Sequence, residues 1–128
     1  EHKGFNGDPG LVYICSDAVI RECVTIHAPT GKASRIGVGA YIMSHAHIGH
    51  DAFISDFAVI STGAMIGGHA VVGIGSYVGL NASLHQFAKI GDGCILGAGC
   101  FFKGTSEDNV KLVGSPARSI GVNHRGKK

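Results

Sequence analysis

Three of the eight histidines of the chain fall within six residues, in the segment SHAHIGHD from Ser44 to Asp51. A histidine followed directly by an aspartate suits proton transfer, because neutral imidazole accepts a proton near neutral pH and a carboxylate can orient the ring. The same side chains are also metal ligands. The segment therefore permits three interpretations: a proton-transfer site, a metal site or a His-rich surface.

The elements that would position these residues follow from a repeat of six. An aliphatic or aromatic residue stands at every sixth position from Ile36 to Phe102, and a small residue follows each one four positions later. This period matches neither a helix nor simple strand alternation, but it fits one short strand plus one turn. Three such units close a triangular coil of about 18 residues. The sequence predicts an all-β fold, a parallel β-helix of hexapeptide repeats with about five coils.

Interruptions of the repeat predict the organisation of the chain. We expect an N-terminal lead-in at 1–13, a β-helix domain at 14–107 and a C-terminal loop and tail at 108–128. Extra residues within the repeat predict a loop at 28–35. The ends of a solenoid expose unpaired strand edges, so we expect further chain or a partner there.

Stacking of the coils would bring distant residues together at one edge of the prism. His50 would lie beneath Gly68, which would lie beneath Gln86, and Asp51 would lie beneath His69. The column beside them would contain four residues: His27, Gly49, Gly67 and His85. This clustering favours a site over a set of incidental surface histidines.

Composition excludes several classes of function. The net charge of +2 is too small to indicate nucleic-acid binding, and the only dense basic run is 125–128. The four cysteines form no CxxC pair, which favours a reduced, cytoplasmic protein. No segment is long and apolar enough to predict a transmembrane helix.

Five segments resemble, in order, motifs of the UDP-N-acetylglucosamine O-acyltransferase family, whose members begin lipid A synthesis: VIRECVTIH, HAHIGHD, MIGGHAVV, LHQFAKIG and SIGVN. The resemblance covers about Val19 to Asn123 and depends mainly on HxxHD followed by GGH and HQF. It implies a left-handed β-helix that forms homotrimers with active sites between subunits. It also implies acyl transfer from acyl carrier protein to a sugar hydroxyl, without a tightly bound cofactor.

The resemblance also implies roles for individual residues. His50 would be the general base and Asp51 its orienting carboxylate. The backbone N–H of Gly68 would suit the oxyanion of the tetrahedral intermediate, because such a donor must be positioned in advance. The remaining motif residues would hold substrate or line the acyl groove: His47, His69, His85 and Gln86.

Other interpretations stay open at this point. The segment VGSPARSIG resembles the ending of acetyl-CoA-dependent sugar acetyltransferases, and Ala98 stands where the family often has a glycine that limits acyl-chain length. His45 and His50 have the H-x4-H spacing of γ-class carbonic anhydrases, which bind zinc. An inactive trimeric scaffold is a third alternative. Lys32, Arg35 and the basic tail at 125–128 are candidate diphosphate contacts.

Overall fold

The computed structural model describes residues 10–31 and 33–124. Within these ranges the regular structure consists of strands, which form three sheets that we name faces A, B and C. Face A contains β1 (Leu11–Ile14), β4 (Ala33–Ile36), β7 (Phe53–Ile54), β10 (Val71–Val72) and β13 (Lys89–Ile90). Face B contains β2 (Val19–Ile20), β5 (Tyr41–Ile42), β8 (Val59–Ile60), β11 (Tyr77–Val78), β14 (Ile95–Leu96), β16 (Val110–Gly114) and β17 (Ala117–Val122). Face C contains β3 (Thr25–Ile26), β6 (His47–Ile48), β9 (Met65–Ile66), β12 (Ser83–Leu84) and β15 (Phe101–Phe102).

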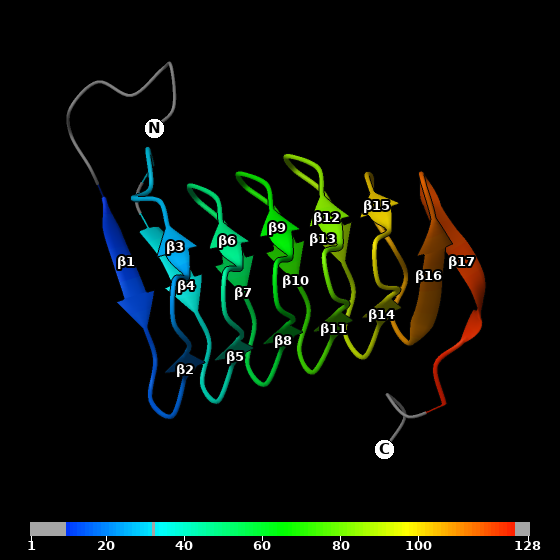
Figure 1. Cartoon of the computed structure of the whole chain (residues 1–128), viewed down its shortest axis with the longest axis horizontal. Coiled ribbons are helices and arrows are strands. Elements are labelled where there is room, and N and C mark those ends of the chain that lie inside the picture. Colours follow the sequence, from blue (N-terminus) through cyan, green and yellow to red (C-terminus); the bar gives the residue numbers. More distant parts are fainter. Residues whose placement is uncertain (1–9, 32, 125–128) are drawn as a thin grey trace.

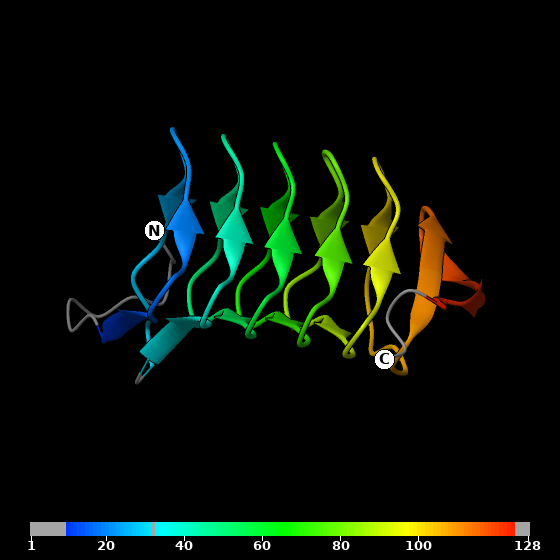
Figure 2. The same cartoon turned by 90° about the horizontal axis from the view of Figure 1, so that it is seen from below.

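The chain runs from face A to face B to face C before the next coil begins, so the coils stack along the long axis of the molecule (Figures 1 and 2). Val71 pairs in parallel with Phe53 below and Lys89 above, which is the expected spacing of one coil. Thr25 pairs with His47, so the first coil is longer by the expected insertion. The described residues form five complete coils, and the predicted parallel β-helix is confirmed.

The repeat has a direct packing explanation. The aliphatic residue of each strand fills the prism, and the small residue four positions later occupies the corner; Ile48 and Ala52 are both fully buried. The residue just before the small one has a positive φ, as at Asp51 (61°) and His69 (59°). Few residue types other than glycine adopt this left-handed conformation, and Asp and His are among the more tolerant ones. The residue types therefore fit the turns that present them.

Two segment boundaries near the N-terminal end differ from the sequence expectations. Strand β1 begins at Leu11, inside the expected lead-in, whose residues 1–9 lie outside the described part of the chain. Strand β4 begins at Ala33, so the loop expected at 28–35 is shorter than predicted. This strand extends because it pairs along its whole length with β1.

The expected loop and tail at 108–128 contain a hairpin instead. Strand β16 pairs in parallel with β14, and β17 pairs antiparallel with β16 across a bulge. Ile95 pairs with Lys111, a spacing of 111 − 95 = 16 residues rather than 18, so the hexad pattern does not reveal this strand. The hairpin lies at the C-terminal end of the stack (Figure 1) and gives β14 a partner on its outer side. Nowhere in the described ranges is there a helix long and apolar enough to cross a membrane.

Candidate active site

The turns that join face C to face A form one edge of the prism, which we name the C–A corner. The turn after β6 carries His50 and Asp51, and the turn after β9 carries Gly68 and His69. The backbone N–H of His69 donates to the carbonyl of His50 at 2.9 Å, so the two turns are stacked directly on each other. The column predicted from the repeat therefore exists in the structure.

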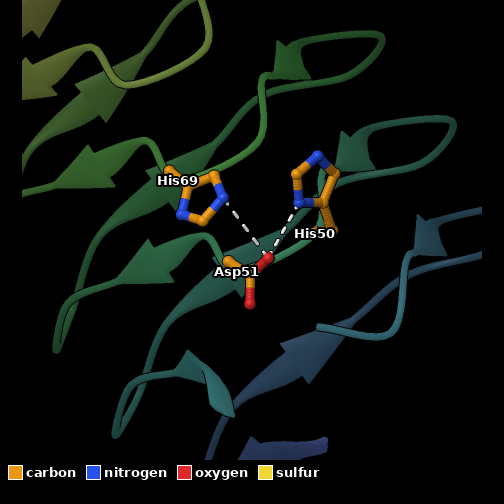
Figure 3. Close-up of side chains that lie close together, drawn as sticks. All are labelled: His50, Asp51 and His69. Carbon is orange, nitrogen blue, oxygen red and sulfur yellow. Dashed lines mark hydrogen bonds and ion pairs between the residues drawn. The ribbon is translucent and has the colours of Figure 1, made fainter. Parts of the chain in front are cut away.

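Asp51 lies between the two imidazoles (Figure 3). Its Oδ2 atom is 2.8 Å from Nδ1 of His50 and 3.5 Å from Nε2 of His69. The centroids of the two imidazole rings are 5.1 Å apart, and the ring planes are nearly perpendicular. We name these three side chains the His–Asp–His cluster.

The loop between β3 and β4 holds the carboxylate of Asp51 in place. The Thr30 hydroxyl donates to Oδ2 at 2.6 Å, the Thr30 backbone N–H donates to Oδ2 at 3.1 Å, and the Gly31 N–H donates to Oδ1 at 2.9 Å. Burial alone raises the pKa of Asp51, but hydrogen bonds from Thr30, His50 and Gly31 outweigh burial and hold that pKa well below its usual range. The carboxylate is therefore ionised at neutral pH.

An ionised carboxylate can only accept hydrogen bonds, so the proton between His50 and Asp51 belongs to Nδ1 of His50. In the neutral ring this leaves Nε2 without a proton. The side chain of His50 is 13% exposed and that of Asp51 is 7% exposed, so both groups are largely shielded from solvent. The arrangement fixes the tautomer that a general base requires.

Gly68 stands directly above the His50 ring. A Cβ atom at this position would lie 2.5 Å from Nε2 of His50, so any side chain there would collide with the ring. The carbonyl of Gly68 accepts from the N–H of Phe87 at 2.9 Å, whereas the N–H of Gly68 meets no acceptor within the described ranges. A backbone donor is thus available beside the unprotonated nitrogen.

His69 is held by packing as well as by its turn. Its ring stacks on the ring of Phe87 from the next coil, with centroids 4.6 Å apart and planes inclined by 12°. Its side chain is 35% exposed, so it is more accessible to solvent than the other two members of the cluster. Phe87 therefore fixes the orientation of a ring that solvent and small ligands can reach.

The remaining predicted residues, His47, His85 and Gln86, lie on face C or in a turn of the C–A corner and have contacts of their own. Nδ1 of His47, on face C, is 2.7 Å from the Thr25 hydroxyl oxygen, and its ring packs edge-on against His27. Burial and the neighbouring His27 lower the pKa of His47. His85, in the turn after β12, has Nδ1 3.0 Å from the backbone carbonyl oxygen of Gln86. These side chains border the C–A corner and widen the candidate site.

Two other candidates lie elsewhere. His45 belongs to the turn after β5, at the corner between faces B and C, so His45 and His50 cannot bind one ion within a single chain. Arg35 forms an ion pair with Asp56 at 2.9 Å and packs over the Phe53 ring, so it is engaged in the wall of face A. Lys32 and the basic tail at 125–128 lie outside the described residues.

Sequence reasoning missed Thr30, Gly31 and Phe87. Thr30 and Gly31 belong to the insertion, for which the repeat gives no neighbours, so no spacing could indicate their contact with Asp51. Phe87 could have been found, because the repeat places it one coil above His69.

The chain matches no protein-family model. It is 54% identical over 88 residues to the acyl-[acyl-carrier-protein]–UDP-N-acetylglucosamine O-acyltransferase of Campylobacter lari, covering 66% of this chain and 34% of that protein. It is 33% identical over 129 aligned positions to the same-named protein of Halorhodospira halophila, covering 98% of this chain and 50% of that protein. The solved structure of UDP-N-acetylglucosamine O-acyltransferase from Moraxella catarrhalis superposes with a TM-score of 0.91 at 28% identity, over 98% of this chain and 50% of that one. The chain thus spans at most about half the length of these proteins, and the left-handed form of the β-helix is confirmed.

Proposed function

Because the chain is a relative of the UDP-N-acetylglucosamine O-acyltransferases, we propose that it carries the catalytic β-helix of such an enzyme. The reaction moves an acyl group, of the 3-hydroxyacyl type, from acyl carrier protein to a hydroxyl of a UDP-amino sugar such as UDP-N-acetylglucosamine. One observation supports this proposal most: an ionised Asp51 keeps the proton of His50 on Nδ1, so that Nε2, which lies against Gly68, can accept a proton.

In the proposed mechanism the sugar hydroxyl oxygen attacks the carbonyl carbon of the acyl thioester while Nε2 of His50 takes the hydroxyl proton. The negative charge that forms on the carbonyl oxygen accepts a hydrogen bond from the N–H of Gly68. When the carbon–sulfur bond breaks, His50 returns its proton to the departing thiolate. Base and oxyanion donor are then both restored.

Asp51 acts on this sequence through His50. Its negative charge stabilises the imidazolium that forms during attack, and its acceptor oxygen keeps the second ring proton on Nδ1. Three donors from Thr30 and Gly31 hold the carboxylate rigidly, so little reorganisation is needed as charge develops.

The surrounding residues complete the proposal. His47, His69, His85 and Gln86 contact substrate, and two exposed apolar side chains, Met65 (48%) and Phe87 (61%), offer surface to an acyl chain or a neighbouring subunit. The active form is a homotrimer with acyl carrier protein as donor partner and no tightly bound cofactor. The four unpaired cysteines fit a reducing cytoplasm.

The decisive experiment measures acyl transfer to UDP-N-acetylglucosamine from 3-hydroxyacyl carrier protein and, separately, from acetyl-CoA. The chain is compared with His50→Ala and with the matched control His45→Ala, whose histidine lies at another corner. We expect activity with the carrier-protein donor that collapses only in His50→Ala. Transfer from acetyl-CoA alone would make the chain an acetyltransferase, and equal rates in both variants would remove His50 from the mechanism.

A further inference from the structure

The His–Asp–His cluster combines the donor atoms of a metal site. His50, Asp51 and His69 each offer one ligand atom, and these atoms all lie within 4.8 Å of one another (Figure 3). Two imidazole nitrogens and one carboxylate oxygen form a set that suits Zn²⁺, which usually binds with tetrahedral geometry and accepts water as a fourth ligand.

Two of the three distances between the ligand atoms are close to those around a tetrahedral ion, and the whole set lies within 4.8 Å. Ligand atoms about 2.0–2.1 Å from a tetrahedral ion lie about 3.3 Å from each other. Oδ2 of Asp51 is already 3.5 Å from Nε2 of His69. Its 2.8 Å hydrogen bond to Nδ1 of His50 would have to open by roughly 0.5 Å, which a small rotation of one ring achieves.

The surroundings hold the ligands as an outer shell does in metal sites. Thr30 and Gly31 fix the carboxylate of Asp51, and the Phe87 ring fixes the plane of His69. Because the side chain of His69 is 35% exposed, an ion and a water molecule can enter from solvent. The cluster is therefore both preorganised and accessible.

We propose that Nδ1 of His50, Oδ2 of Asp51 and Nε2 of His69 bind a zinc-like divalent ion, and that this ion switches off the site. The inhibitory part rests on the proposed function; ion binding does not. A neutral imidazole carries one ring proton. When the ion occupies Nδ1, that proton moves through solvent to Nε2, the atom that must receive the hydroxyl proton. Ion binding and base catalysis therefore exclude each other.

Binding is tested on the intact, chelator-treated chain by calorimetric titration with Zn²⁺ and by the visible spectrum of Co²⁺ as a probe of tetrahedral coordination. Loss of a direct ligand in His69→Gln or Asp51→Asn should weaken binding by more than about tenfold, since even an outer partner of a ligand contributes about ten- to a hundredfold. Thr30→Val tests the contribution of such an outer partner to Zn²⁺ affinity, because it removes the hydroxyl that donates to Oδ2 of Asp51. The matched control His45→Gln, at another corner, should bind as the unaltered chain does.

Two results would overturn the inference. Equal Zn²⁺ affinity in His69→Gln, Asp51→Asn and the unaltered chain would place the ion elsewhere, provided that thermal unfolding shows both variants folded; if one does not fold, the other decides. Zn²⁺ that binds at the cluster without slowing acyl transfer would refute the switch. A chain without transfer activity in metal-free buffer would contradict the proposed function instead, and the binding titration would remain valid.

Discussion

Two corners of the prism use the same turn for different purposes. At the corner between faces A and B, Oδ1 of Asp56 accepts the N–H of Val38 from the coil below, and Asp92 caps Ile74 in the same way. At the C–A corner the equivalent position is taken by His50, Gly68 and, one coil higher, Gln86. Aspartate caps the turn amides at the first corner, whereas the amide of Gly68 has no cap within the described ranges.

Asp51 and Asp56, which lie in successive turns after β6 and β7, show the same contrast. Hydrogen bonds from Val38 and Arg35 lower the pKa of Asp56, and the guanidinium of Arg35 neutralises its charge. Asp51 is more buried and is stabilised by neutral donors from Thr30 and Gly31, so its charge remains available to His50. The carboxylate of Asp56, paired with a cation, links two coils. The carboxylate of Asp51, held by neutral donors, can act on an imidazole.

Asp51→Asn should break the contrast most strongly. The side-chain amide of asparagine would donate to Nδ1 of His50 and so favour the tautomer with the proton on Nε2. The same substitution in a comparable His–Asp pair reduces kcat by up to about 10⁴-fold because the histidine takes the wrong tautomer. Steady-state acyl-transfer kinetics measure the effect. A decrease in kcat no larger than that caused by a surface substitution would mean that the carboxylate of Asp51 does not set the tautomer of His50.

Gly68→Ala should cause the second-largest loss of acyl transfer. The new methyl group would meet Nε2 of His50, and displacement of a reacting group by about 1 Å can cost about 100-fold in rate. The backbone of Gly68 has no positive φ, so the thermal midpoint should change little. Kinetics and thermal unfolding measured together separate displacement of the ring from loss of fold; unchanged transfer would contradict the placement of His50.

Thr30→Val should lower the rate of acyl transfer moderately and lower the free energy of unfolding in a way that depends on pH. Removing the hydroxyl raises the pKa of Asp51 toward its ordinary value of about 3.9 and should slow transfer by about tenfold. The folded-state pKa of Asp51 is depressed, so its stabilising contribution is present above the unfolded value and is lost as pH falls toward the folded one. Unfolding measured at a series of pH values should show a deficit in Thr30→Val at neutral pH that shrinks below about pH 4. A constant deficit would exclude Asp51 as its source.

Asp56→Asn should have the smallest effect on catalysis, because Asp56 belongs to the other corner. The change removes the charge partner of Arg35 and weakens the cap on Val38, so the thermal midpoint should fall. Transfer should stay within about twofold, since distant sites act independently. A large loss of transfer would show that the two corners are coupled.

The repeat predicted most of the fold because one structural unit recurs. Each hexad encodes one strand, one turn and one buried aliphatic residue, so a single period supplies the pairing of the middle coils and the column that joins His50, Gly68 and Gln86. The hairpin of β16 and β17 follows no such period, and its pairing depends on contacts with β14 and between its own strands.

The amino-acid sequence by itself determined the β-helix, the stacking of Asp51 beneath His69 and the kind of chemistry that imidazole and carboxylate permit. Only the tertiary structure decided the tautomer of His50, because that depends on the ionisation of Asp51. The donors that keep Asp51 ionised come from Thr30 and Gly31 in an irregular loop, which lies about 20 residues away and is brought to the carboxylate by the closure of one coil.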